Sequence, residues 1–175
     1  MEDAYIGQAQ DAALGREFLT WLWFKSEEKN GIFAGPDNLD FALYVEQRVS
    51  VQGGEGESLE TATVSGRMSE LREARLGLTT GKKVSRALIR LERDAEAWQV
   101  TVKAEDFSLS GFKTPKVETK TEEGDDPDAL FLERIFLLDK ALGFLDHVFA
   151  GFVRLRLSPQ WAEECAAIRI WLSKS

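Results

Sequence analysis

Apolar and polar residues alternate with a period of two in three stretches of the chain, which is the pattern of half-buried β-strands. The first stretch covers residues 41–51, and Gln47 is the one break on its apolar side. The glycine-rich GGEGE after it leads into SLETATVSG, which predicts a return strand and a hairpin. The other two stretches, 86–91 and 98–104, flank a turn at DAEA and predict a second hairpin, which Phe107, Leu109 and Phe112 extend.

Helical spacing of apolar residues predicts two helices in the first half of the chain. Residues 11–25 form a helix with almost no polar face, so this helix needs burial on several sides. The segment SEEKNGIFAGPDN after it is rich in turn residues and predicts a loop. Residues 68–78 suit a short helix that turns Leu71, Ala74 and Leu78 toward the core. Its basic neighbours Arg67, Arg72 and Arg75 are able to face water.

Two further helices are predicted at the C-terminus. Asp126 and Pro127 have the pattern of an N-cap followed by proline in the first turn, and a long amphipathic helix follows as far as Phe152. Ser158 and Pro159 repeat this start signal before a last helix. That helix places Trp161, Cys165, Ile168 and Leu172 on one face. The polar segment 113–128 between sheet and helix is expected to be an exposed loop.

These elements define an α+β fold in which antiparallel β-hairpins pack against an N-terminal helix and two C-terminal helices. The 175 residues, 43% of them hydrophobic, suffice to bury a core. The simplest organisation is a single domain over 1–175, and two lobes at 1–66 and 67–175 are the alternative.

The net charge and the cysteine content limit the expected binding partners and the expected cellular compartment. Twenty-two basic and thirty acidic side chains give a net charge of −8, which argues against a global attraction to DNA or anionic lipid. Any site for a polyanion must therefore be local. The apolar stretches are too short or too often charged to span a membrane, the N-terminus lacks the features of a secretory signal, and one cysteine cannot form an intrachain disulfide. A soluble, cytoplasmic protein is expected.

The residues offer little for catalysis. His147 is next to Asp146 on a helix, where neighbouring side chains diverge by about 100°, so the two do not form a dyad. Cys165 fits a small core residue. The acidic stretch 122–128 suggests a metal-dependent nuclease, but consecutive carboxylates in a loop are better explained by loop solubility and the helix dipole. We expect no enzyme, no cofactor and no metal.

Basic residues gather in the middle of the chain. Residues 67–90 contain seven basic and two acidic side chains. On a short helix, a turn and one strand face, the basic residues can share a surface that binds phosphates without reading sequence. The alternative is that they pair with acidic neighbours or protect a sheet edge. The candidate nucleic-acid-binding residues are Arg67, Arg72, Arg75, Lys82, Lys83, Arg86, Arg90 and Lys103.

The order of elements around LTTGKKVSRALIRLERDAEAWQVTVKAEDFSLSGFKTPKV resembles the C-terminal half of the RdgC family of recombination-associated proteins. Gly81, Lys82 and Lys83 are the most distinctive matching positions, and LGREFLTWLWF near the N-terminus is also similar. The resemblance covers about Leu14 to Trp171. It implies binding of double-stranded DNA without marked sequence preference, a homodimer, and association with the nucleoid. A typical member has an N-terminal half without counterpart here, so a separate chain supplying it is a further expected partner.

Charge pattern and resemblance together predict a non-enzymatic, sequence-independent DNA-binding module associated with recombination. Its basic strand face would contact the phosphate backbone. The alternative is a protein-interaction or assembly module that uses the apolar helices and does not bind nucleic acid directly. A metal-dependent nuclease remains as a third hypothesis.

Overall fold

The computed structural model describes residues 14–53, 60–65, 71–116 and 127–173, with side chains placed for all of these except 47–49, 52–53, 60–65, 71–73 and 127. Helices and strands are both present and do not alternate regularly along the chain, as is typical of an α+β protein. They are α2 (Gly15–Glu28), β1 (Ile32–Ala34), β2 (Asp40–Gly53), β3 (Glu60–Ser65), α3 (Leu71–Thr79), β4 (Lys83–Arg93), β5 (Glu96–Lys103), β6 (Leu109–Lys113), α4 (Pro127–Arg156) and α5 (Trp161–Ser173).

The strands form one six-stranded antiparallel sheet in the order β1-β2-β4-β5-β6, and β3 also pairs with β2. β2 is long enough to pair with β1 near its start and with β3 near its end. The register between β2 and β4 shifts between Val45 and Val49, where Gln47 interrupts the apolar alternation. A local irregularity of this kind bends the strand and lets the alternation resume.

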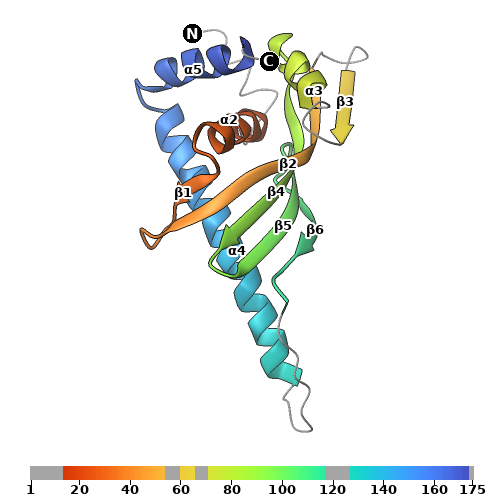
Figure 1. The fold of residues 1–175 in the computed structure, drawn as a ribbon, viewed down its shortest axis with the longest axis vertical. Coiled ribbons are helices and arrows are strands. Elements are labelled where there is room, and N and C mark those ends of the chain that lie inside the picture. The colour runs from red at the N-terminus through yellow and green to blue at the C-terminus, as the bar shows by residue number, and fades with distance from the viewer. Residues whose placement is uncertain (1–13, 54–59, 66–70, 117–126, 174–175) are drawn as a thin grey trace.

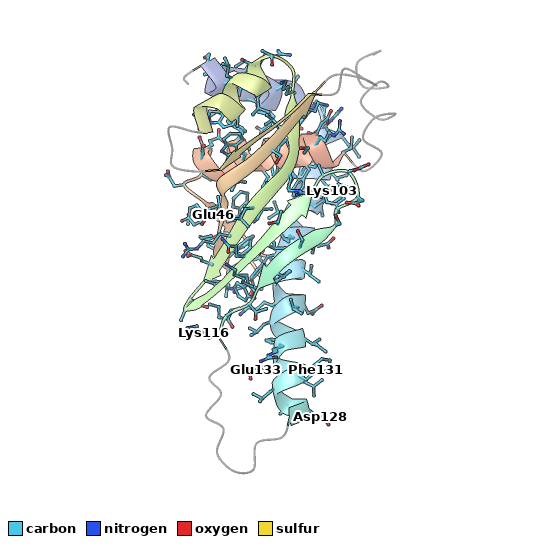
Figure 2. All side chains as sticks on the ribbon, turned by 90° about the vertical axis from the view of Figure 1, so that its right-hand side faces the viewer. Glu46, Lys103, Lys116, Asp128, Phe131 and Glu133 are labelled. Carbon is cyan, nitrogen blue, oxygen red and sulfur yellow. The ribbon has the colours of Figure 1, made fainter. Side chains whose placement is uncertain are left out.

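The described helices cover one face of the sheet (Figure 1). α2 and α4 pack across this inner face, α5 lies beside α2, and α3 lies next to β3 at the end of the sheet. The opposite face, which we call the outer face, is seen in front of α4 in Figure 2, with Glu46 of β2 and Lys103 of β5 on it. No described helix covers the outer face. The predicted α+β fold, with hairpins packed against one N-terminal and two C-terminal helices, is confirmed.

Aromatic side chains fill the space between sheet and helices. Trp23, Trp98 and Phe152 are among the largest fully buried side chains. Phe41 of β2 stacks on Phe144 of α4 with ring centroids 4.5 Å apart. The burial of Trp98 places the first residue of the alternating stretch 98–104 on the inner face. Because α2 lies between the sheet, α4 and α5, it is buried on most of its surface, as its nearly continuous apolar sequence predicts.

Two element boundaries differ from the expectation. Ile32–Ala34, placed in a loop by its turn-rich surroundings, forms the edge strand β1 and pairs with the start of β2. α5 begins at Trp161, two residues after Pro159, because the backbone N–H groups of Trp161 and Glu164 donate to the carbonyls of Ser158 and Gln160. None of the described helices is long and apolar enough to cross a bilayer.

Candidate nucleic-acid interface

The pairing of β4 with β5 brings three of the eight candidate residues onto the outer face. Arg86 and Lys103 are Cα partners across the two strands, and Arg90 lies opposite Gln99. At the alternate positions of β4, Ala87, Ile89 and Leu91 are completely buried on the inner face. Since side chains alternate along a strand and paired residues share a face, Arg86, Arg90 and Lys103 project to the same side. We call these three residues the basic cluster.

Two members of the basic cluster have acidic neighbours. Lys103 Nζ lies 2.7 Å from Glu105 Oε2 and 3.8 Å from Asp106 Oδ2. The hydrogen bond from Lys103 to Glu105, with the charge of Asp106 in addition, raises the pKa of Lys103 above its usual 10.5. Arg90 pairs with Glu92 and lies 3.8 Å from Glu46. The two cations are thus partly neutralised by carboxylates, which are exposed beside Lys103 and half-buried beside Arg90.

Arg86 is the least compensated member. It is exposed, and no carboxylate in the described part of the chain forms an ion pair with it. The positive charge of Arg86 acts against protonation of Lys103, so the two cations sense each other across the strand pair. Two like charges held this close favour an anion between them.

Arg75 does not belong to this surface, because its side chain is only 20% exposed and is held by other elements. Its guanidinium pairs with Glu27 of α2 and lies over the rings of Trp171 and Trp23, at 4.7 Å and 5.7 Å from their centroids. The Nε atom of Arg75 is buried without a hydrogen-bond partner among the described residues. Arg75 therefore joins α3 to α2 and α5 and is a structural residue.

The described residues do not place any of the other candidates in the basic cluster. Lys83 is directed to Glu17 of α2, with 3.4 Å between Nζ and Oε1, and Glu17 also accepts a hydrogen bond of 2.7 Å from Arg156. Lys82 lies in the turn before β4, is half-buried and has interactions of its own. Arg72 lies in α3, but its side chain is outside the described set, and Arg67 is outside the described residues altogether.

The outer face has functional candidates that the sequence reasoning missed. Lys113 of β6 is exposed and is the Cα partner of Gln99, so it projects to the same side as the basic cluster. Tyr44 of β2 is the Cα partner of Arg90 and is 37% exposed. The sequence alone could not place Lys113 on this face, because its side is set by which residue of β5 it pairs with. Glu92 adds a negative charge to the same face, so the surface is mixed and not uniformly basic.

The residues considered for catalysis are His147, Cys165 and the acidic stretch 122–128. The described residues include no group of three His, Cys, Asp or Glu side chains that would hold a metal ion. His147 is a half-buried residue of α4, and burial raises the pKa of the Cys165 thiol above its usual 9.0, which makes the reactive thiolate scarcer. Most of the acidic stretch 122–128 lies outside the described residues.

Comparisons with known proteins add no relative: no protein-family model matches the chain, and no curated protein and no solved structure is significantly similar to it.

Proposed function

We propose that this domain is a non-enzymatic DNA-binding module that contacts the phosphate backbone, without reading sequence, through the outer face of its sheet. The observation that carries the proposal is the convergence of Arg86, Arg90 and Lys103 on a face that no described helix covers. The exposed Lys113 extends this row. Cations aligned along adjacent strands suit a backbone that presents one phosphate after another.

The acidic neighbours of Arg90 and Lys103 weaken the positive potential but do not block the surface. Ion pairs between exposed side chains contribute little to stability, because water and salt already screen them. A phosphate offers the same cations a charge-assisted hydrogen bond and releases counterions from DNA on binding. By contrast, Arg75 and Lys83 are held by glutamates of α2 and are left out of the proposed surface.

The proposed association with recombination and the nucleoid rests only on the sequence resemblance of the segment from Leu14 to Trp171 to the RdgC family, which no family model supports. A second candidate function, a protein-assembly module, is favoured by a different observation, the large apolar side chains that α4 exposes. The two functions use different surfaces of the domain and do not exclude one another.

Fluorescence anisotropy with a labelled mixed-sequence duplex tests the proposal. The wild-type chain should bind at about 50 mM salt and lose roughly 40-fold in affinity at about 200 mM, as three phosphate contacts require. Arg86→Glu combined with Arg90→Glu should abolish binding. The matched control is Arg154→Glu with Arg169→Glu, which makes the same charge change at exposed positions of α4 and α5 and should bind nearly as well as wild type. Equal affinity of the two double variants would refute the assigned surface.

A further inference from the structure

The N-terminal part of α4 extends beyond the sheet and exposes large apolar side chains to solvent. Figure 2 shows Asp128, Phe131 and Glu133 on this projecting part. Leu137 is the first buried hydrophobic residue along α4. The exposed fractions are 63% for Phe131, 63% for Leu132, 44% for Ile135, 64% for Phe136 and 42% for Leu142. Together these side chains present on the order of 500 Å² of apolar surface, as much as the largest patches on typical monomers, which are often interaction sites.

One row of apolar residues runs along α4, and another helix packs against this row only in its C-terminal half. The row recurs at alternating intervals of four and three residues and consists of Phe131, Ile135, Leu138, Leu142, Leu145, Phe149 and Phe152. In the C-terminal half, Phe149 and Phe152 pack against Phe18 of α2, with ring centroids 5.1 Å and 5.4 Å apart. An apolar helix therefore covers this half. No described element covers the N-terminal half in the same way.

We propose that the N-terminal half of α4 pairs with the same helix of a second copy of this chain, as a parallel two-stranded coiled coil over residues 131–142. The row then occupies the a and d positions of two heptads, with Ile135 and Leu142 at a and Phe131 and Leu138 at d. A β-branched residue at a, followed by leucine at d, favours two parallel strands over larger assemblies.

The charges beside the row select a copy of this chain as the partner. Arg134 falls at a g position and Asp139 at the following e position, and both are exposed. Five residues apart on one helix, they do not face each other within a single chain. In a parallel pair, Arg134 of each copy meets Asp139 of the other, and the two-fold axis makes this contact twice. An antiparallel pair sets like positions against each other and forfeits both contacts.

The fold leaves room for this pairing. Leu137, Ala141 and Phe144 turn toward the sheet of their own chain. At 100° per residue, this core-facing side lies about 110° around the helix from the a and d row, so each sheet stands to one side of the seam. From Leu145 onward the row is half-buried in its own core, which ends the coiled coil near Leu142.

Analytical ultracentrifugation of the full chain across a wide concentration range, without DNA, tests this inference independently of the proposed DNA binding. The wild type should move with concentration from 19.6 kDa to twice that mass. Ile135→Asp should remain a monomer over the same range. The matched control is Phe136→Asp, which is on the same projecting part and more exposed, but falls at a b position outside the seam; it should still dimerise. A wild type that stays monomeric, a larger assembly, or a dimer that survives Ile135→Asp overturns the proposal.

Charge exchange tests the orientation. Arg134→Asp and Asp139→Arg should each weaken self-association about tenfold, since each breaks two ion pairs and opposes like charges, and the double variant should recover it. In a Cys165→Ser background, Ile135→Cys should form an interchain disulfide under mild oxidation, because a positions face each other across a parallel seam. The parallel pair is rejected if the double charge variant does not recover self-association and Ile135→Cys does not form the interchain disulfide.

Discussion

The indole nitrogen of Trp98 donates a hydrogen bond of 2.9 Å to the main-chain carbonyl of Leu137. Both residues are buried, and the bond joins β5 to α4 at the turn where α4 enters the core. The N-terminal part of α4 extends past the sheet, and the rest of the helix packs on the sheet (Figure 1). Trp98 therefore fixes the point at which α4 leaves the domain.

Trp98→Phe should destabilise the fold by about 2–3 kcal/mol, because it removes this hydrogen bond and leaves part of the indole volume empty. Chemical denaturation measures the change. Trp161→Phe is the matched control: Trp161 is only partly buried and its indole makes no hydrogen bond to another described residue, so its replacement should cost less than about 1 kcal/mol. Equal losses would contradict the role of Trp98.

Glu27 should matter much more than its neighbour Glu28. Glu27 accepts hydrogen bonds from the indoles of Trp23 and Trp171, at 2.9 Å and 2.8 Å, and pairs with Arg75. Glu27→Ala should cost about 1–3 kcal/mol, since it leaves the half-buried guanidinium without its anion. Glu28→Ala removes one surface pair with Lys25 and should change the free energy of unfolding by less than about 0.5 kcal/mol. Urea denaturation of the two variants compares them.

Two helical glycines should respond in opposite directions to replacement by alanine. A Cβ at Gly15 would lie 1.9 Å from the carbonyl oxygen of Ala104, so Gly15→Ala forces α2 away from the sheet and should cost about 2 kcal/mol or more. A Cβ at Gly143 meets no atom within 4 Å. Gly143→Ala should therefore stabilise α4 by about 0.5–1 kcal/mol, the difference in helix propensity. Thermal unfolding distinguishes the two.

Much of the fold follows from the sequence, because the spacing of apolar residues along a segment indicates which of its side chains are buried. β4 and β5 bury alternate residues over most of their length, and β2 does so at Phe41 and Leu43, so these side chains predict strands that pair as hairpins. β1 carries no such signal, because its three residues are too few for a period and its strand state comes from pairing with β2. The start of α5 was misplaced because Pro159 is accommodated in the preceding turn and not in the first turn of the helix.

The candidate site was only partly predictable, for a physical reason. Strand parity placed Arg86 and Arg90 on one face, and the register with β5 adds Lys103. Helical periodicity also turned Arg75 outward from its own helix, but it contains no information on Trp171, which follows nearly a hundred residues later and covers that side. Ion pairs such as Lys83 with Glu17 likewise depend on tertiary packing.

Asp37 should contribute to stability only where it is ionised. The hydrogen bond from Arg93 to Asp37, 2.5 Å long, lowers the pKa of Asp37 below its usual 3.8. The folded state therefore binds this proton less tightly than the unfolded state, so the contribution is present above about pH 4 and is lost as the pH falls through the lowered pKa. Asp37→Asn should destabilise the protein at neutral pH and have a smaller effect near pH 2.5. The control Asp146→Asn removes a carboxylate at an exposed position of α4 and should change the free energy of unfolding at neutral pH by less than about 0.5 kcal/mol in urea denaturation.

The salt dependence of DNA affinity tests the central claim, that the outer face of the sheet contacts phosphates, most directly. Each lost phosphate contact lowers the slope of log affinity against log salt by about 0.9. The triple variant Arg86→Gln, Arg90→Gln and Lys103→Gln should therefore bind more weakly and lose on the order of 2–3 units of slope, whereas Lys83→Gln should leave the slope unchanged. A triple variant with the wild-type slope and affinity would contradict the account.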